Sequence, residues 1–322
     1  VFSSYSLLKS TIRLNEYVET GKLLGYKQLA LTDDGVLHGA VEFYERCIQN
    51  GIQPILGCTF EVAWKSDASR KEMLVVYAKG AKGYESLLKL STLYQQGLTW
   101  TSEMTEWIVA HNEDVKIVLP PMDSEWVAAH SKGKLESVLR AVKEEFPGVE
   151  IAVGITREMV ERGEFDTMRE GIEAAGVVPV AFSVSRYLNT TDYFSWKVLQ
   201  AIRLGETLSF TQEDATGSES LPEATSMTKV FQAAEDGGLL SNLEQFTKDL
   251  VVEIPLRDTM LPKFPVPGGK TSTQFLYELC EAAMLEIGVT TPIYVNRLKE
   301  ELAVIHEMGF DDYFLIVWDI MR

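Results

Sequence analysis

Apolar stretches alternate with amphipathic stretches over roughly the first two hundred positions of the chain. One apolar run ends at Thr32, and others that predict strands lie at 53–57, 58–62, 73–78, 116–119, 149–155 and 177–182. Helical spacing with one buried face is found at 39–50, 82–95, 134–146 and 162–175. Repeated strand–helix units favour a parallel sheet or barrel over a sandwich, but periodicity does not separate an open doubly wound sheet from a closed barrel.

The pattern changes in the last third of the chain. Glu, Thr, Ser and Gln crowd 206–226, which predicts an irregular surface insert, and helical spacing returns at 227–249. The segment 261–269, LPKFPVPGG, holds three prolines and two glycines, so it fits neither a helix nor a central strand and predicts a domain boundary. A helical stripe follows within 295–305, and the final run YFLIVWDIMR is strongly apolar, which predicts a truncated second domain.

Composition narrows the class of protein. The chain has 322 residues with 46% hydrophobic content, enough for a sizeable core. Its net charge of −17 repels nucleic-acid phosphates, so weak or no DNA binding is expected. No apolar run is long enough to span a membrane, and no signal-peptide pattern is visible. The three cysteines lie far apart, which disfavours disulfides and structural zinc and predicts a cytoplasmic location.

The segment 27–40, KQLALTDDGVLHGA, carries the most informative chemistry. An apolar strand ends in Thr32-Asp33-Asp34-Gly35 and an amphipathic helix follows, so two carboxylates are expected at the mouth of a βα loop. Asp-Asp-Gly is also ordinary turn chemistry that satisfies backbone donors at a helix start. On these residues alone, the turn role is the simpler interpretation.

Together with the opening VFSSYSLL, this motif resembles the PHP (polymerase and histidinol phosphatase) domain of the bacterial DNA polymerase III alpha-subunit family. In that family the first strand carries His-x-His-Ser and the second ends in Thr-Asp-His-Gly. The tail ELAVIHEMGFDDYFLIVWD is similar to the start of the family's polymerase palm, and LPKFPVP to its linker. The resemblance thus covers nearly the whole chain, in order.

The resemblance implies a fold and a division into domains. We expect an α/β fold, a distorted (β/α)7 TIM-like PHP barrel, followed by the helical start of the palm. The PHP domain would occupy residues 1–266, with the irregular and helical insert at 206–250 after the barrel. Residues 267–322 would be the truncated beginning of the palm.

The resemblance also indicates where metal ligands would lie. Active family members hold two or three divalent ions with His, Asp and Glu from several strand ends. Here only Asp33 keeps a family ligand, with Asp34, in place of a histidine, as a substitute. The remaining positions carry side chains that the family does not use as ligands, and the resulting vestigial site is Phe2, Asp33, Asp34, Thr59, Met73, Thr156, Val184 and Arg186.

No metal site is therefore expected. Arg186 brings a positive charge, and we expect it to pair with Asp33 or Asp34 in the space of the lost metal. The four histidines do not lie close to other ligand-type residues at strand ends, so they are interpreted as surface or capping residues: His38, His111, His130 and His306.

The resulting hypothesis is an N-terminal fragment of a replicative polymerase alpha subunit. Its barrel would be a structural and interaction domain without phosphoesterase activity, and the fragment would bind no cofactor. The full-length protein would be a DNA-directed DNA polymerase whose carboxylates and Mg²⁺ lie beyond Arg322. Expected partners are the rest of the polymerase chain and proofreading or clamp subunits of the replisome. The alternative is an active metal-dependent PHP phosphoesterase or 3′–5′ exonuclease with rearranged ligands. A stand-alone TIM-like sugar-phosphate enzyme is disfavoured by the palm-like tail.

Overall fold

A computed structural model describes residues 1–64, 67–97, 99–122, 124–208, 219–233, 238–256 and 262–321, with the side chains of 63–71 outside that description. The chain divides into two compact units, Val1–Ile254 and Pro255–Arg322. Parts of the predicted insert (209–218 and 234–237) and Leu261 of the predicted linker lie outside the described residues.

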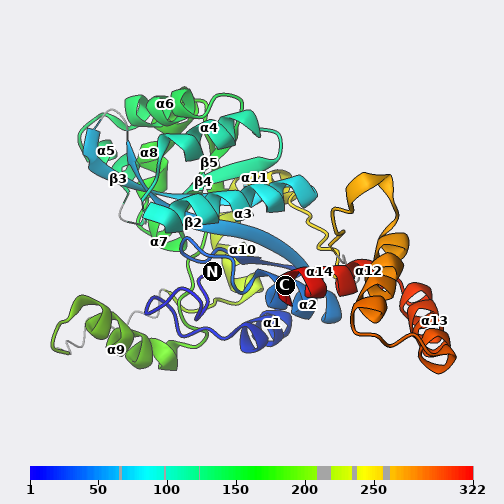
Figure 1. Ribbon diagram of the computed structural model, residues 1–322. Helices are drawn as coiled ribbons and strands as arrows, with labels where there is room; N and C mark the ends of the chain where they lie inside the picture. Colours follow the sequence, from blue (N-terminus) through cyan, green and yellow to red (C-terminus); the bar gives the residue numbers. More distant parts are fainter. Residues whose placement is uncertain are drawn as a thin grey trace. The chain divides into compact units, whose positions relative to one another are not determined.

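One sheet forms the centre of the first unit (Figure 1). Its described strands lie in the order β1-β2-β3-β4-β5-β6. Their bounds are β1 (Gln28–Leu31), β2 (Gln53–Trp64), β3 (Asp67–Ala78), β4 (Val115–Leu119), β5 (Glu150–Ile155) and β6 (Val178–Ala181). The pairs β1–β2, β4–β5 and β5–β6 are parallel, as expected.

The third strand departs from the expected parallel arrangement, because β3 runs antiparallel to both β2 and β4. β2 ends at residue 64 and β3 begins at residue 67, so no helix lies between them. A parallel connection needs a crossover of a dozen or more residues, whereas a direct return makes the two strands antiparallel. β3 is therefore the exception to the parallel arrangement that the repeated strand–helix units favour.

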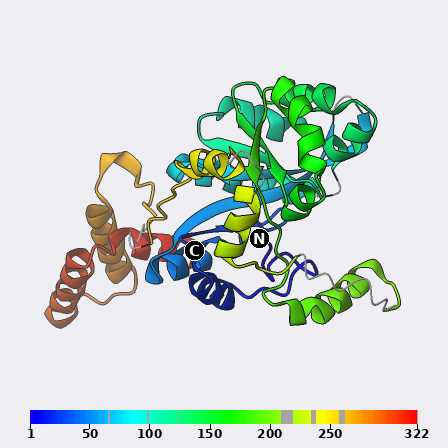
Figure 2. The same ribbon diagram turned by 180° about the vertical axis from the view of Figure 1, so that it is seen from behind.

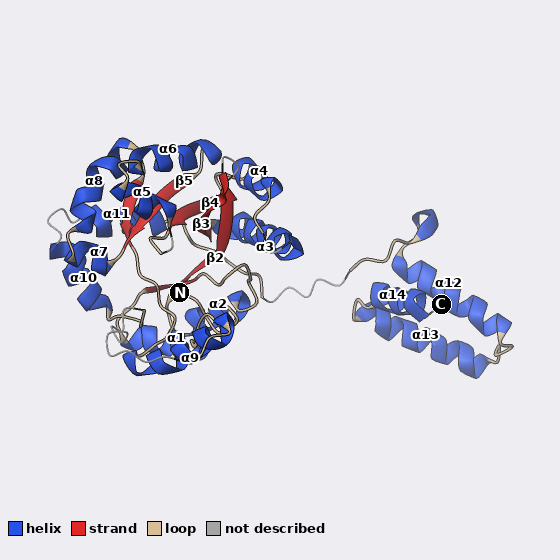
Figure 3. Ribbon diagram, turned by 90° about the vertical axis from the view of Figure 1, so that its left-hand side faces the viewer, coloured by secondary structure: helices blue, strands red, loops and turns tan. Residues whose placement is uncertain are grey.

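Helices surround the curved sheet, as Figure 3 shows. In chain order they are α1 (Leu14–Leu23), α2 (Ala40–Gln49), α3 (Gly80–Gly97), α4 (Ser102–Ala110), α5 (Glu125–Ser131), α6 (Leu135–Glu145), α7 (Arg157–Glu161), α8 (Glu164–Ala174), η1 (Thr190–Asp192), α9 (Tyr193–Leu204), α10 (Ala224–Ala233) and α11 (Gly238–Thr247). The helices predicted at 39–50, 82–95, 134–146 and 162–175 correspond to α2, α3, α6 and α8. The arrangement confirms the predicted TIM-like α/β class.

Both faces of the sheet are covered by apolar side chains. One face belongs to the large core that includes Leu56, Val76 and Ile117. On the other face, Ile55, Val118 and their neighbours pack with Phe246 and Leu250, at and after the end of α11. Figure 2 shows α10 (yellow-green) and α11 (yellow) on this side. Burial on both faces explains why the strands appear in the sequence as nearly continuous apolar runs.

A buried lysine holds the end of α11 on the sheet. Lys116 of β4 is only 2% exposed. Its ammonium donates to Phe246 O (2.8 Å) and pairs with Asp249 Oδ1 (2.7 Å) and Glu150 Oε2 (2.9 Å). Lys79 also pairs with Asp249 Oδ2 (3.1 Å). Because a buried ammonium is costly unless it is fully compensated, these partners are what allow Lys116 to lie in the core.

A buried carboxylate lies in the middle of β3. Glu72 is 1% exposed, and its Oε2 accepts a hydrogen bond from Glu125 N (3.0 Å) at the first residue of α5. Its Oε1 has no hydrogen-bond partner among the described residues. Burial raises the pKa of Glu72 to about 8, although the backbone hydrogen bonds of Glu125 and Trp126 oppose the shift.

The second unit consists of helices. They are η3 (Pro267–Gly269), α12 (Ser272–Glu286), α13 (Pro292–Glu307) and α14 (Asp311–Met321). Phe264, in the predicted linker, stacks on Phe275 and meets Trp318 edge-on, with ring centroids 6.1 and 6.4 Å apart. Its amide donates to Asp312 Oδ1 (2.9 Å). This part of the linker therefore packs within the second unit, and the assignment of that unit to a palm stays a prediction.

Candidate functional site

The predicted site residues surround the N-terminal segment, where it crosses the ends of β1 and β6. Thr32 N, just after β1, donates to Val1 O (2.9 Å). Phe2 N donates to Ser185 O (3.2 Å), four residues after β6. The first two residues thus lie between the ends of β1 and β6, at the mouth where β/α proteins place their chemistry.

Asp33 is the most enclosed of these residues, with 1% exposure. Its Oδ1 accepts from Ser3 N and Ser6 Oγ, both at 2.6 Å, and its Oδ2 accepts from Ser3 Oγ at 2.7 Å. Burial raises the pKa of Asp33, while the hydrogen bonds from Ser6 and Ser3 oppose the rise. Both carboxylate oxygens are therefore engaged by the chain's own donors.

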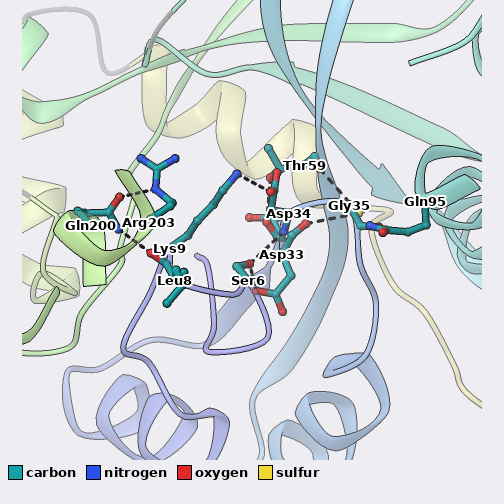
Figure 4. A network of polar contacts seen from close by, with 12 residues as sticks. Ser6, Leu8, Lys9, Asp33, Asp34, Gly35, Thr59, Gln95, Gln200 and Arg203 are labelled. Atoms are coloured by element: carbon teal, nitrogen blue, oxygen red, sulfur yellow. Dashed lines mark hydrogen bonds and ion pairs between the residues drawn. The ribbon is translucent and has the colours of Figure 1, made fainter. Parts of the chain in front are cut away.

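Asp34 has a lysine partner. The ammonium of Lys9 pairs with Asp34 Oδ2, and Asp34 N donates to Ser6 Oγ (3.0 Å). Figure 4 shows Lys9 reaching across to Asp34 from the N-terminal segment. That segment is held in turn by α9, since Gln200 Nε2 donates to Leu8 O (2.8 Å) and Trp196 Nε1 to Lys9 O (3.1 Å). A cation is thus built into the mouth beside Asp34.

Arg186 pairs with a different carboxylate from the one expected. Its Nε donates to Glu219 Oε1 (3.0 Å), and its guanidinium lies over the ring of Phe2, 4.8 Å from the centroid. The predicted pairing with Asp33 or Asp34 is wrong. Asp33 is occupied by serine and amide donors, and Asp34 by Lys9, so Glu219 is the carboxylate that remains for Arg186.

The backbone of Arg186 joins the same segments. Its amide donates to Glu219 O (2.9 Å), and its carbonyl accepts from Ser10 Oγ (2.8 Å) and Thr11 N (2.9 Å). Arg186 therefore ties the N-terminal segment to residues that follow the 206–218 region. The guanidinium on Phe2 adds a cation–π contact to these hydrogen bonds.

The other predicted positions play simpler roles. Thr59 Oγ1 donates to Thr32 O (2.8 Å), so it pins β2 to the end of β1. Thr156 and Val184 both line a cavity of about 650 Å³ at the ends of β4, β5 and β6. Met73 lies on β3 opposite Glu61 of β2, and no described contact joins it to Asp33. The structure therefore brings Phe2, Asp33, Asp34, Thr59 and Arg186 together, but not Met73.

The two arginines that line the 650 Å³ cavity each have a carboxylate neighbour. Arg157 donates to Glu161 (2.7 Å), and Arg162 lies 3.7 Å from Glu164. A phosphate group needs unpaired cations or aligned donors. Neither arginine that lines this cavity supplies an unpaired one.

Sequence reasoning missed four contributors to the mouth: Ser3, Ser6, Lys9 and Glu219. Ser3, Ser6 and Lys9 lie in or beside the opening VFSSYSLL, which the family motif already places next to Asp33. The serine hydroxyls of this segment could therefore have been predicted as hydrogen-bond donors to Asp33. Glu219 lies in a stretch rich in Glu, Ser and Thr, where nothing distinguishes it from its neighbours.

Comparison with known proteins identifies the fold family. A model of the PHP domain matches residues 1–165, just over half of the 322 residues. The chain belongs to the PHP domain family. A second model, of the bacterial DNA polymerase III alpha NTPase domain, matches residues 274–322.

Curated relatives of this PHP protein match along its whole length. The DNA polymerase III alpha subunit of Halalkalibacterium halodurans is 34% identical over 336 residues, and that of Bacillus subtilis is 30% identical over 327 residues. Each alignment covers 100% of this chain and 29% of the relative, so the chain spans less than a third of their length. The predicted resemblance is confirmed. An amidohydrolase structure from Chromobacterium violaceum is 12% identical with a TM-score of 0.38 over 56% of this chain and 84% of its own, too low to add to the assignment.

The residues at the PHP mouth do not fit a metal cluster. Phe2 and Val184 have no donor atom, Arg186 is cationic, and both oxygens of Asp33 already accept hydrogen bonds. In the part of the chain that the structure describes, no three His, Cys, Asp or Glu side chains form a group able to hold a metal ion. None of the described helices is long and apolar enough to cross a membrane.

Proposed function

We propose that this PHP barrel is a structural and interaction domain without phosphoesterase activity, within a DNA polymerase III alpha subunit. The observation that carries the proposal is the set of contacts at the mouth. Lys9 pairs with Asp34, Ser3 and Ser6 saturate Asp33, and Arg186 pairs with Glu219. Asp33, Asp34 and Glu219 are thus each neutralised or hydrogen-bonded by other residues of the chain.

The chemistry of these contacts supports a stabilising role. Multinuclear metal sites work by lowering the pKa of bound water and by holding phosphate oxygens. An ammonium group or a hydroxyl does neither, but it can compensate a buried carboxylate and join distant segments. The same positions thereby connect the N-terminal segment, the end of β1 and the segment after β6.

The role of the longer protein follows from its relatives. We infer a DNA-directed DNA polymerase that uses Mg²⁺ in a polymerase site outside residues 1–322, and a cytoplasmic location. The barrel would brace the rest of the polymerase chain and contact proofreading or clamp subunits. The net charge of −17 supports weak or no DNA binding by this region itself. Primer extension by the longer protein tests the polymerase assignment.

The barrel is tested by metal analysis and hydrolysis. Purified chain is incubated with Mn²⁺ or Zn²⁺, desalted and analysed for bound metal, and assayed on bis(4-nitrophenyl) phosphate. We expect less than stoichiometric metal and no hydrolysis above buffer. One or more tightly bound ions per chain, with hydrolysis that Asp34→Asn abolishes, would establish an active phosphoesterase with rearranged ligands instead.

A matched variant shows that the assay can detect a site in this fold. The combined substitutions Phe2→His, Asp34→His, Thr59→Glu, Val184→Asp and Arg186→His return ligand-type side chains to the mouth. We expect this variant, if folded by circular dichroism, to retain more metal than the starting chain. Equal, high metal retention by both chains would contradict the proposal.

A further inference from the structure

Helix α9 is attached to the rest of the first unit along one side. None of the twelve residues of Tyr193–Leu204 is buried, and Figures 1 and 2 show the helix lying away from the central sheet. Trp196 and Gln200 donate to carbonyls of the N-terminal segment, and the ring of Tyr193 meets that of Tyr187, with centroids 6.1 Å apart. The side of α9 that carries these three residues is called the attached side.

A row of apolar side chains lies on the opposite side of α9. Phe194, Val198 and Ile202 follow one another at intervals of four residues, so they share one face of the helix. Phe194 lies two positions before Trp196, and Val198 two positions before Gln200, which turns this face by about 200° from the attached side. Phe194 is 56% exposed and Ile202 is 61% exposed. Phe194, Val198 and Ile202 are called the outer stripe.

The outer stripe has the form of a surface that packs against a helix. Single apolar side chains on a surface are ordinary, but residues spaced by four along a helix form a ridge, and such ridges pack into the grooves of another helix. From Phe194 to Ile202 the stripe spans about 12 Å, a little over two turns. Its shape therefore favours a helix of a few turns as the occupant.

The charges beside the outer stripe are positive. Lys197 lies on one side of it and Arg203 on the other, and no acidic residue occurs within Tyr193–Leu204. The Lys197 ammonium lies 6.0 Å from the ring centroid of Tyr193, and Arg203 Nε donates to Gln200 Oε1 (2.9 Å), so both cations stay close to the helix. In a chain with 47 acidic and 30 basic residues, this is a local reversal of sign. A complementary surface therefore carries Asp or Glu beside its apolar side chains.

Other classes of occupant fit the outer stripe less well. Val198 and Ile202 are aliphatic and offer no aromatic face for stacking a base, and the net charge of −17 opposes the approach of nucleic acid or of an anionic lipid surface. A symmetric pair of two copies through α9 would bring the Lys197 and Arg203 side chains of both copies together, and like charges at an interface oppose association. An acidic helix of another protein meets neither objection.

We propose that the outer stripe of α9 docks an acidic amphipathic helix of a partner protein. The apolar side chains of that helix pack on the outer stripe, and its carboxylates pair with Lys197 and Arg203, as in helix pairs with an apolar seam and flanking ion pairs. The inference rests on the interaction role proposed above and names the chemistry of the partner. It concerns α9 and not the mouth, so either proposal can fail without the other.

The test measures binding of a defined acidic peptide to the purified chain. The probe is a fluorescein-labelled peptide made of two repeats of Glu-Leu-Glu-Ala-Leu-Glu-Ala, and its control has Ser in place of each Leu. Because the chain is strongly acidic, an acidic peptide has little general attraction for it, and saturable binding reports a local site. We expect fluorescence anisotropy to show saturable binding of the Leu peptide, weaker in 1 M salt, and no binding of the Ser peptide.

Variants of exposed residues locate the site. Ile202→Ser removes an apolar side chain of the outer stripe, and the combined Lys197→Glu and Arg203→Glu reverses the flanking charges. Leu88→Ser is the matched control, because Leu88 is 43% exposed on α3, outside the outer stripe. We expect the first two variants to bind the Leu peptide at least about tenfold more weakly than the starting chain, and Leu88→Ser to bind it equally well. Circular dichroism checks that each variant is folded.

Each contrary result overturns a defined part of the proposal. Absence of saturable binding, or equal binding by Ile202→Ser, would mean that the outer stripe is not the site. Full binding by the charge-reversed variant would mean that the site does not select acidic partners. Self-association of the starting chain that Ile202→Ser abolishes would make a second copy the occupant, and competition by oligothymidine would make it nucleic acid. Binding to this chain but not to the longer protein would mean that the rest of the polymerase covers α9.

Discussion

Lys9 and Asp34 form an ion pair at the mouth of the barrel, although 25 positions separate them in the sequence. Asp34 stands where the family motif Thr-Asp-His-Gly has a histidine, so the ion pair involves a position that the resemblance assigns to a ligand. Lys9 itself is fixed through its carbonyl by Trp196 of α9. Through these contacts the N-terminal segment, the residues after β1 and helix α9 are joined at the mouth, where the resemblance implies the family's metal ligands.

The strength of this pair can be measured by a double-mutant cycle. Lys9→Met and Asp34→Asn are expected to show a coupling energy of about 0.5–1 kcal/mol in urea unfolding, since the two side chains are 30% and 22% exposed and water screens them partly. The coupling should fall in 1 M salt. Additive effects of the two substitutions would show that the pair contributes no net stability.

Asp33 should contribute more to stability than Ser3, one of the two serines that donate to it. Asp33→Asn puts an amide group against the hydroxyls of Ser3 and Ser6 and leaves a donor without its acceptor, so a loss of about 2–4 kcal/mol is expected. Ser3→Ala removes one of the three donors to Asp33, the Ser3 hydroxyl, and keeps the Ser3 amide and the Ser6 hydroxyl, so it should cost about 1 kcal/mol. Denaturant unfolding of the three proteins provides the comparison, and a cost below that of Ser3→Ala would contradict the ranking.

Lys116 should be essential for the packing of α11. Lys116→Met leaves Phe246 O without its ammonium donor and Asp249 with Lys79 alone, and a loss of about 2–3 kcal/mol is expected. Lys79→Met, which removes a partly exposed partner of the same carboxylate, should cost less than about 1 kcal/mol. Urea unfolding measures both losses, and equal losses of unfolding free energy in the two variants would show that the burial of Lys116 does not increase its contribution to stability.

Glu72 should make stability fall as pH rises. Its pKa is about 8 in the folded protein and near 4.5 when exposed, so between these values the folded state holds a proton that the unfolded chain releases. Stability is therefore highest below the lower pKa and falls by up to about 1.4 kcal/mol per pH unit until the upper one is passed.

Glu72→Gln checks this dependence, because the amide cannot ionise. The difference in unfolding free energy between the variant and the starting chain should grow from pH 5 to pH 8 in favour of the variant. Parallel stability profiles for the two proteins would mean that Glu72 is ionised in the folded state.

Periodicity predicted the elements whose signal is local. β4, β5, α6 and α8 were found within two residues at each end, because one buried face or a short apolar run defines them. The direction of β3 was not predictable in the same way. It depends on how closely β3 follows β2, and two apolar strands look alike in sequence whether the second returns directly or follows a crossover helix.

The candidate site was predictable in its positions but not in its contacts. The family motif brought Phe2, Asp33 and Arg186 to attention, and the structure does place them together. The choice of Glu219 over Asp33 and Asp34 as the partner of Arg186 depends on a segment 33 residues further along the chain. No pattern in sequence encodes which of three carboxylates a guanidinium reaches.

The position of Arg186 has a consequence for synthesis of the chain. Ser10 and Arg186, which share a hydrogen bond, are 176 residues apart, and Glu219 comes later still. During translation, residues 1–10 therefore emerge from the ribosome well before their partners Arg186 and Glu219 have been made. Helices such as α2 and α3 can form locally in that interval, but the mouth can close only afterwards, and nascent-chain proteolysis would register its closure as late protection of residues 1–10.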